Sequence, residues 1–589
     1  MRNPELEIVR VFLFYFSIFE IKIFSILSRK KIIYSSLIII VISVLSFSNS
    51  IKNNFVNWDD DILVLNNDDI KSLKKDNFSA FFSNYYVGHY HPLTMISYAI
   101  DYGIGELKPK VYHIHNLILH ILNSILLLLI FFHFFKRIDI ALLLVLLFAV
   151  HPLKVESVSW ISERKDLLYS FYYLGGILSY LYYLKNDRKI KYIILCFILF
   201  ILALLSKTSA VTLPVILLLI DYYYKPKAFL KSILEKIPFF IVSIAFGIFT
   251  IYILKESDAI YDISDKYNFV DRLFLPFYAI AFYIVKLFVP FDLSASYFFT
   301  EKINGLLPWY YYASPIVIVI AIFLIKKTKE IRKELIFGFL FFLISIFLFL
   351  QILPSGRVIV ADRYAYIPYI GLLFIIGKLF LLKTENKKGK KNKRTYISII
   401  VIFIIVFIFQ TRERNKVWQN GETLFTDIIN DYPKNSIGYV NRGIAKYYGF
   451  TDNNKIDYIS AIKDFNKALS FDLESVKALF NRGNCLYNLN DLNGALNDFN
   501  RVIEIDPFHA KAYNNRGLVF SVLNNDNNAL SDYNKAIEIN PEYSDAILNR
   551  GITYFNMNNI EKACNDWKKA AKLNNKRAGE MILNYCKQL

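Results

Sequence analysis

The sequence predicts an all-α protein in which a polytopic helical membrane domain precedes an array of paired-helix repeats. Of its 589 residues, 55% are hydrophobic and only 20% are charged, and the mean hydropathy is +0.34. A soluble chain of this length carries more charge and fewer long apolar runs. Towards the C-terminus the apolar runs stop, and the triplet Asn-Arg-Gly recurs instead. We therefore divide the chain into an N-terminal cytoplasmic or interfacial segment (1–31), a transmembrane domain (32–410) with an outer loop (50–112), a helical linker (411–435) and the repeats (436–589).

About eleven apolar runs in the transmembrane domain predict membrane spans, because a helix needs about 20 apolar residues to cross about 30 Å of hydrocarbon. The spans are placed at 32–49, 113–133, 138–150, 167–184, 192–206, 208–222, 237–254, 313–325, 335–353, 361–382 and 395–410. The apolar stretch 273–290 is interpreted as a re-entrant or interfacial helix. The alternative, in which 273–290 spans the membrane and another run does not, stays open.

The basic residues predict the orientation of the spans. The formal net charge is +19, and much of the excess lies in clusters beside apolar runs, such as Arg29-Lys30-Lys31, Lys136-Arg137 and Lys387 to Arg394. Such clusters are typical of cytoplasmic loops that meet anionic lipid, so they do not indicate nucleic acid as a partner. If 273–290 spanned, the basic stretch 326–333 would lie outside, against this bias. The N-terminus is then cytoplasmic and the repeats lie on the outer face, together with loops 50–112, 151–166, 255–271, 291–312 and 354–360.

The composition also predicts the compartment. A chain rich in Ile, Lys and Asn is typical of an AT-rich bacterial genome, which places the protein in a bacterial cytoplasmic (inner) membrane with its outer face in the periplasm or cell exterior. In the N-terminal segment, residues 9–28 are apolar but interrupted by Arg10, Glu20 and Lys22. We expect an interfacial helix there and not a cleavable signal, because no small-residue cleavage site follows.

Four cysteines are too few for a disulfide framework in so long a chain. One lies in an apolar run and three lie in the repeats, so we interpret all four as structural thiols: Cys196, Cys485, Cys564 and Cys586.

The repeats have the period of tetratricopeptide repeats. The triplets begin at Asn441, Asn481, Asn515 and Asn549, and the last three are about 34 residues apart. Small residues recur where two helices would pack closely, and a large aromatic residue follows each pair: Phe499, Tyr533 and Trp567. The first repeat fits this pattern if residues 451–455 are an insertion. Stacked helix pairs form a superhelix whose concave face usually binds a peptide or protein, although a purely structural spacer is the alternative.

Polar residues in the first outer loop are the first candidates for chemistry. Asp59 and Asp60 directly follow a membrane helix, where a carboxylate can accept the proton of a hydroxyl that attacks a sugar carbon. A solvated acidic cap is the alternative. His89 and His91 follow in the same loop, but no cysteine or matched carboxylate completes a metal site. We therefore expect His91 to hydrogen-bond substrate or the loop itself, and we expect neither a metal nor another cofactor.

Four cations on the outer face are candidates for binding a phosphate. Arg164 and Lys165 lie outside, against the usual charge bias, and Lys207 and Arg363 lie at the same outer edge in this topology. Cations that converge there would neutralise a departing lipid phosphate, as cleavage of a sugar–phosphate bond requires. The alternative is internal pairing, of Arg164 with Asp166 or Glu163 and of Arg363 with Asp362.

Taken in order, these stretches resemble a known family. They are Trp58-Asp59-Asp60, His91-Pro92-Leu93-Thr94, His151-Pro152 with Glu156, Arg164 and Asp166, Ser206-Lys207, Ala361-Asp362-Arg363-Tyr364, and Trp418 with Glu422-Thr423-Leu424-Phe425. The chain is similar to bacterial multispanning membrane proteins with C-terminal tetratricopeptide repeats. It also resembles their eukaryotic relatives, the transmembrane-and-TPR O-mannosyltransferases.

The resemblance implies a GT-C type fold and a polyprenyl-phosphate sugar donor that enters from the bilayer. Carried over to this chain, Asp59 or Asp60 is the catalytic base, and Arg164, Lys207 and Arg363 hold the lipid phosphate. Further residues of these motifs are candidates for the substrate pocket: His91, His151, Glu156 and Asp362. The chain departs from the eukaryotic pattern at His91, where the family has arginine, and this puts one phosphate or acceptor contact in doubt.

The sequence thus predicts an inverting glycosyltransferase that moves a sugar such as mannose to a hydroxyl of a protein acceptor bound by the repeats. Asp60 is our first choice of base and Asp59 our second. Two rivals remain. A membrane-anchored scaffold for envelope proteins would need only one span, and a transporter of lipid-linked sugars would predict two symmetric halves.

Overall fold

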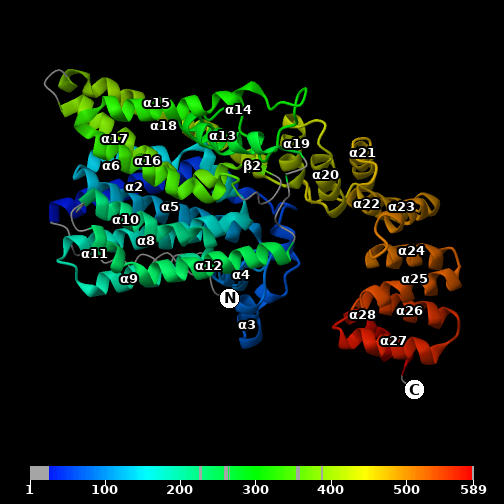
Figure 1. Ribbon diagram of the computed structural model, residues 1–589. Coiled ribbons are helices and arrows are strands. Elements are labelled where there is room, and N and C mark those ends of the chain that lie inside the picture. The colour runs from blue at the N-terminus through cyan, green and yellow to red at the C-terminus, as the bar shows by residue number, and fades with distance from the viewer. Residues whose placement is uncertain are drawn as a thin grey trace. The chain divides into compact units, whose positions relative to one another are not determined.

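The computed structural model describes residues 26–224, 229–257, 263, 266–352, 358–385 and 389–586. The chain forms two compact units, residues 1–420 and 421–589, which we call the membrane unit and the repeat unit (Figure 1). Both are almost entirely helical. Of the expected N-terminal segment 1–31, residues 1–25 lie outside the described residues.

Each of the eleven predicted spans contains an α-helix. The helices concerned are α2 (Ile26–Phe47), α5 (Pro109–Phe135), α6 (Ile138–Ala149), α8 (Arg164–Lys185), α9 (Ile190–Ser206), α10 (Leu213–Tyr224), α12 (Ile237–Glu256), α15 (Pro315–Lys327), α16 (Arg332–Ile346), α17 (Tyr369–Glu385) and α18 (Gly389–Asn415). Helices α16 and α17 approach closely, since a Cβ on Gly338 would lie 2.6 Å from the carbonyl oxygen of Gly371. Glycine, which has no side chain, allows two helices to approach this closely.

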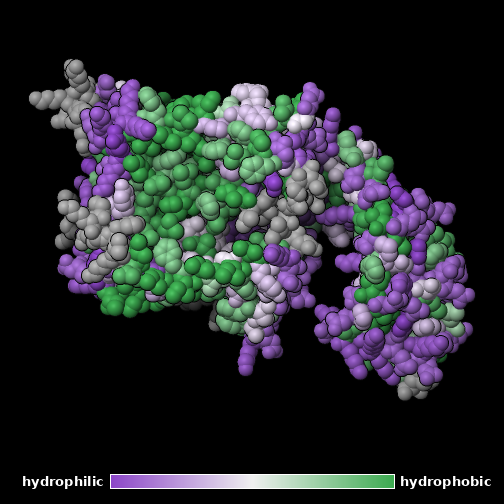
Figure 2. Space-filling view, viewed as in Figure 1, coloured by the Kyte–Doolittle hydropathy of each residue, from purple (hydrophilic) through white to green (hydrophobic). Residues whose placement is uncertain are grey.

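Five helical stretches are long and apolar enough to cross a membrane, and a sixth is a bent pair with a 62° turn, so the protein is a multi-pass membrane protein. The five are Arg29–Phe47, Pro109–Phe135, Ile237–Glu256, Trp309–Lys327 and Asn392–Trp418, and the bent pair is Ile138–Ala149 with Pro152–Ser159. Apolar side chains on these helices are exposed, such as Ile248 at 65% and Val319 at 63%. Figure 2 shows a broad hydrophobic surface over this unit and a mainly hydrophilic one over the repeats. The number of eleven spans stays a prediction.

Short elements connect the long helices. They are η1 (Ser50–Lys52), η2 (Asp61–Leu65), η3 (Asp69–Lys71), α3 (Lys75–Ser83), α4 (Pro92–Gly105), η4 (Pro152–Lys154), α7 (Val155–Ser159), η5 (Ile161–Glu163), η6 (Thr208–Thr212), α11 (Phe229–Leu234), α14 (Trp309–Ala313), η8 (Lys329–Ile331), η9 (Phe347–Phe349), η10 (Asp362–Ala365) and η11 (Lys416–Trp418). Strands β1 (Tyr297–Phe298) and β2 (Val358–Val360) pair antiparallel, with Tyr297 opposite Val360.

The stretch 273–290 forms most of helix α13 (Phe269–Phe288), which is not among the candidate spans of the described residues. A capping box begins the helix, because the Asn268 side chain accepts a hydrogen bond from the Asp271 backbone and Asp271 reciprocates. One face of α13, including Leu275 and Tyr283, is buried against α16 and α17 residues in a hydrophobic cluster. Its interpretation as re-entrant or interfacial stays a prediction.

The repeat unit is a series of antiparallel helix pairs. Helix α19 (Gly421–Asp431) precedes the pairs α20 (Ser436–Tyr448) with α21 (Tyr458–Leu469), α22 (Val476–Asn488) with α23 (Leu492–Ile505), α24 (Ala510–Val522) with α25 (Asp526–Ile539) and α26 (Ser544–Asn556) with α27 (Ile560–Lys572), and helix α28 (Lys576–Tyr585) ends the series. The connection within the first pair is longer than in the others, which confirms the expected insertion near residues 451–455.

The arginine of each Asn-Arg-Gly triplet joins the two helices of its own pair. Arg482, Arg516 and Arg550 each pair with an aspartate that follows by 16 residues on the second helix. In the first pair the separation from Arg442 to Asp464 is 22 residues, because the insertion lengthens the connection. A bidentate arginine–carboxylate contact is geometrically specific, so the triplet fixes the alignment of each pair.

The glycine of each triplet lets an aromatic ring from the second helix lie against the first. A Cβ on Gly551 would be 2.6 Å from the Trp567 ring and 3.2 Å from the Ala563 carbonyl oxygen. We expect Gly551→Ala to destabilise the last pair by about 1–3 kcal/mol, the usual cost of overpacking. Hydrogen exchange of the full-length protein in detergent would show faster exchange in α26 and α27.

Gly579→Ala is the matched control, because no atom lies within 4 Å of its added Cβ. Within a helix, alanine is more stable than glycine by roughly 0.5–1 kcal/mol, so this variant should exchange no faster than the wild type. Equal exchange of α26 and α27 in both variants would contradict the packing role of Gly551.

The expectation of four structural thiols is wrong for two of them. Cys564 and Cys586 form a disulfide, whereas Cys196 and Cys485 are free and buried. The spacing of four cysteines along the chain could not reveal this pair, because the approach of α28 to α27 depends on how the last helices fold together.

Candidate active site

The candidate site lies where two membrane helices end next to each other. Asn415, the last residue of α18, donates from Nδ2 to the Ser46 carbonyl at 3.1 Å and to Asn49 Oδ1 at 3.0 Å. Asn53 Nδ2 donates in turn to the Asn415 carbonyl at 3.2 Å. These contacts hold the start of the first predicted outer loop against the end of the membrane unit. We call this the site end of the unit.

Asp60 is completely enclosed by protein. Its side chain is 1% exposed and accepts hydrogen bonds from the backbone N–H of Val56 and of Ser162, each at 3.0 Å, and from the Ser162 hydroxyl. Burial raises the pKa of Asp60 to about 7, although the three hydrogen bonds lower it. The hydrogen bonds from Ser162 to Asp60 connect the first outer loop to the segment before α8.

Asp59 differs from its neighbour in geometry and access. Its backbone φ is 70°, in the left-handed region that non-glycine residues seldom adopt, and its side chain is partly exposed. Such conformations concentrate at functional sites. Burial raises the pKa of Asp59, while the charges of Lys165 and Arg363 lower it. Within the described part of the chain, its carboxylate accepts no hydrogen bond, so it remains available to a ligand.

Three of the four predicted cations converge on one carboxylate, that of Glu163. Its oxygens lie 3.1 Å from Lys165 Nζ, 3.8 Å from Lys207 Nζ and 3.4 Å from Arg363 Nε. Lys207 also pairs with Asp166. Residues distant in sequence therefore form one cluster of alternating charge beside Asp59. Glu163 was not among the sequence-predicted site residues; its position beside Arg164 and Lys165 was the available signal.

Arg363 is held by partners on several elements. Its guanidinium and its backbone N–H both donate to Glu156, and it lies over the Trp160 ring at 5.7 Å. Buried Lys154 donates to the carbonyls of Ala365 and Tyr366, which follow Arg363 in the same turn. Residues of the connection between α6 and α8 therefore hold the turn that contains Arg363 in place. Glu156 pairs with Arg363, whereas Asp362, proposed in the pairing alternative, accepts from Tyr297 at 2.8 Å.

Arg164 has a different environment from the other three cations. It is fully buried, pairs with Asp101, and donates to Asn116 Oδ1 at 2.8 Å and to the Tyr112 carbonyl at 2.9 Å. Its guanidinium also lies over the rings of Tyr98 and Tyr112. The expected pairing alternative with Asp166 or Glu163 is wrong, because Asp101 on α4 takes that place. Asp101 was missed because it lies in an otherwise apolar stretch.

The two candidate histidines are both buried but differ in their hydrogen bonds. His91 is 2% exposed, and both its ring nitrogens are buried without a hydrogen-bond partner among the described residues. Its helix begins beside Lys207, since Thr94 Oγ1 donates to the Ser206 carbonyl at 3.2 Å. Burial, and after it the charge of Lys165, lowers the pKa of His91. His151 is instead bonded within the fold, to the Leu287 carbonyl and the Leu153 N–H.

The described residues contain no group of three or more His, Cys, Asp and Glu side chains that could hold a metal ion. His89 and His91 have their ring centroids 6.4 Å apart. The carboxylates of Glu156, Glu163 and Asp166 are paired instead with lysine or arginine, whose charges oppose a bound cation. The cluster therefore offers N–H donors to an anion and one accessible carboxylate to a proton.

Comparison with known proteins covers both units. Models of the tetratricopeptide repeat match residues 476–509, 510–543 and 532–565. The crystal structure of MamA is similar at 22% identity, with a TM-score of 0.24, over 27% of this chain and 90% of MamA.

The predicted family resemblance is confirmed at the level of sequence similarity. The chain is 22% identical to mouse "Protein O-mannosyl-transferase TMTC3" over 515 residues, which cover 77% of this chain and 53% of the relative. It is 23% identical to the Caenorhabditis elegans "Protein O-mannosyl-transferase F38B6.6", over 74% of this chain and 63% of the relative. The chain thus spans about half the length of the curated relatives it matches, or slightly more.

The buried Asp60 carboxyl predicts a pH-dependent stability. Its pKa is about 7 in the folded protein and near 3.8 ordinarily, so the folded state binds the proton more tightly. Stability from this group is fully present below pH 3.8 and is lost as the pH rises towards 7, on the order of 4 kcal/mol in total. We expect thermal unfolding in detergent to show a larger loss of stability from pH 5 to pH 8 in the wild type than in Asp60→Asn. Equal losses would contradict this assignment.

Proposed function

We propose that the protein is an integral-membrane glycosyltransferase. It transfers a sugar from a polyprenyl-phosphate donor to a hydroxyl of a protein acceptor on the outer face of a bacterial cytoplasmic membrane. The observation that carries this proposal is the cluster of Lys165, Lys207 and Arg363 around Glu163, with the accessible carboxylate of Asp59 beside it. Relatives named protein O-mannosyl-transferases support the same class, with mannose as the first sugar to test.

The cations bind the phosphate of the donor. An ammonium has three N–H donors, so the contacts with Glu163 and Asp166 leave donors of Lys165 and Lys207 for phosphate oxygens. Arg363 adds a planar guanidinium, whose side chain is 19% exposed and so accessible from the site. As the bond between the sugar carbon and the phosphate oxygen breaks, negative charge collects on the phosphate. The fixed cations stabilise that charge more in the transition state than in the bound donor.

Asp59 is the base in this proposal, ahead of Asp60. The acceptor oxygen attacks the sugar carbon from the side opposite the phosphate, which inverts the configuration, while the hydroxyl proton moves to the Asp59 carboxylate. Asp60 is less suited, since its oxygens already accept three hydrogen bonds within the fold. The two unpartnered nitrogens of His91 provide a donor or acceptor for a sugar hydroxyl or a phosphate oxygen.

In this proposal the membrane unit binds the sugar donor and the repeat unit binds the acceptor. A GT-C type membrane domain with about eleven spans would admit the donor from the bilayer. Tetratricopeptide repeats generally bind proteins or peptides, which favours a polypeptide acceptor over a small lipid. The large apolar surface of the membrane unit suits contact with lipid and with a polyprenyl chain.

Glycoprotein profiling by mass spectrometry tests the proposal. Envelope proteins of wild-type cells, a deletion strain and the complemented deletion are compared. We expect a sugar modification to disappear on deletion and to return on complementation, and its mass and site identify the sugar and acceptor. Unchanged glycosylation, together with the accumulation of a lipid-linked sugar on one side of the membrane, would favour a transporter. Unchanged glycosylation with mislocalised envelope proteins would favour a scaffold.

A further inference from the structure

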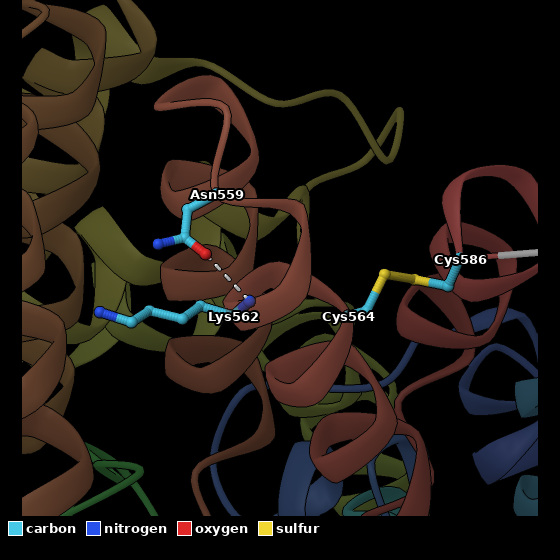
Figure 3. Close-up of a disulfide and its surroundings, with 4 residues drawn as sticks. All are labelled: Asn559, Lys562, Cys564 and Cys586. Carbon is cyan, nitrogen blue, oxygen red and sulfur yellow. Dashed lines mark hydrogen bonds between the residues drawn. A yellow bond between two sulfur atoms is a disulfide. The ribbon is translucent and has the colours of Figure 1, made fainter. Parts of the chain in front are cut away.

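The last repeat is closed by a covalent bond. Cys564 lies on α27 and Cys586 directly follows α28, and their sulfur atoms form a disulfide across 22 residues of sequence (Figure 3). Both side chains are buried in the hydrophobic cluster that also contains Trp567, Ala570 and Ala578. The disulfide thus lies inside the packed end of the array and not on a mobile surface loop.

Helix α28 covers the end of the repeats. Terminal repeats need a cap because one face of their last helix has no neighbour. Helix α28 has only ten residues, of which Ala578 is buried, and an isolated helix of this length is unstable in water. Packing against α27 and the Cys564–Cys586 bond together hold it in place.

A buried disulfide of this kind indicates the compartment in which the array folds. Disulfides form and persist in oxidising compartments and are rare where thiol reductants are abundant. In forming the bond, the two thiols lose two protons and two electrons to the disulfide of a thiol–disulfide oxidoreductase, which becomes a dithiol. The two remaining cysteines, Cys196 and Cys485, are buried and free, so they offer no competing pairing in the folded protein.

The site end of the membrane unit is also the end from which the chain continues to the repeats. The Trp418 ring stacks on the Trp160 ring at 5.2 Å, and the Arg363 guanidinium lies 5.7 Å from the same Trp160 ring. Among the described residues after Trp418, no helix is long and apolar enough to cross a membrane. The chain therefore passes from the site end into the repeat unit without a further candidate span among these residues.

We infer that the Cys564–Cys586 disulfide is the covalent cap of the repeat array, and that it forms in an oxidising compartment, the outer face of the membrane in the proposed function. The disulfide and the distribution of basic loops are independent observations that lead to the same orientation. The inference rests on the outer-face orientation of the proposed function, but not on glycosyl transfer itself. A protein inactive as a transferase could still have this orientation, and an active one could have reduced thiols.

The first measurement traps thiols in living cells. Cells producing the full-length protein are quenched with acid, free thiols are blocked with a maleimide under denaturing conditions, and peptides are mapped with and without reductant. We expect a peptide linked through Cys564 and Cys586 and single blocked thiols at Cys196 and Cys485. Four blocked thiols without reduction would overturn the inference.

The second measurement tests the side of the membrane directly. Sealed vesicles of right-side-out and inside-out orientation are treated with protease, and the array is followed by an antibody to the repeats. We expect digestion in right-side-out vesicles and protection in inside-out ones. The reverse pattern would overturn the assignment of the compartment even if the disulfide were present.

The role of the disulfide as a cap is tested with matched double variants of the full-length protein. Cys564→Ser/Cys586→Ser removes the bond, whereas Cys196→Ser/Cys485→Ser removes only the free thiols. We expect protease to cut α28, at Lys576 or Arg577, about tenfold faster in the first variant than in the wild type, because the helix opens more often. The second variant should be cut there at the wild-type rate. Equal rates in both variants would overturn the capping role.

Discussion

Replacing Asp59 with asparagine should lower sugar transfer by a factor of about 10² to 10⁴ while leaving the protein folded, because general-base catalysis contributes that much. Asparagine keeps the shape of the side chain and tolerates the positive φ of this position, but it cannot accept a proton. Transfer is measured in the complemented deletion strain from the ratio of modified to unmodified acceptor peptide. It is also measured with purified protein and a polyprenyl-phosphate sugar.

Two further variants test whether the loss of transfer is specific to the Asp59 carboxylate. Asp68→Asn removes an exposed carboxylate of the same loop that pairs only with Lys71 in the described contacts, so it should leave transfer unchanged. Asp60→Asn should mainly change stability and its pH dependence. If Asp60→Asn instead abolished transfer in a stable protein while Asp59→Asn remained active, Asp60 would be the base, as the sequence predicted.

Replacing Arg164 with methionine should destabilise the membrane unit by about 3–5 kcal/mol, because it leaves the Asp101 carboxylate buried without its arginine partner. We expect a strongly lowered thermal midpoint in detergent and little folded protein in the membrane. Adding Asp101→Asn should recover part of this loss, because the unmatched charge is then removed. The double variant therefore tests the ion pair itself and not only the loss of side-chain volume.

Arg137→Met is the matched control for Arg164. Arg137 pairs with Asp139 at the surface, where the arginine is 38% exposed, and such pairs contribute only about 0–1 kcal/mol. The thermal midpoint of the Arg137→Met variant should stay close to that of the wild type. If Arg164→Met were as stable as the control but bound the lipid-phosphate donor more weakly, Arg164 would be a phosphate ligand, as the sequence suggested.

Most of the local structure could be predicted because it depends on patterns within short segments. Apolar runs indicated each long helix of the membrane unit, and the 34-residue period indicated the repeats. The triplet even marked the insertion in the first pair, where Arg442 reaches Asp464 over 22 residues instead of 16. The number of helices that span the membrane was harder to predict from the sequence. Helices such as α8 begin with Arg164 and Lys165, and hydropathy alone does not tell whether such a helix crosses the membrane.

The candidate site was predicted as a set of segments but not as a set of contacts. The predicted outer loops contained Asp59 and Lys165, and Lys207 and Arg363 were predicted at the outer edge of membrane spans. The structure brings these four residues close together. The sequence could not tell Asp59 from Asp60, because adjacent carboxylates differ only in which one meets Ser162. It also grouped Arg164 with Lys165, although side chains one residue apart on a helix point in different directions.

The sequence by itself determined the parts of the protein: an apolar helical unit, a repeat array, and a group of acidic and basic residues near the ends of the apolar helices. These features follow from residue type and period, which act over a few turns of helix. Only the tertiary structure decided which charges meet: Glu163 with three cations, Arg164 with Asp101, and Cys564 with Cys586. Apart from the contact of Glu163 with Lys165, these pairings join residues far apart in the chain, and the partners depend on which helices pack together.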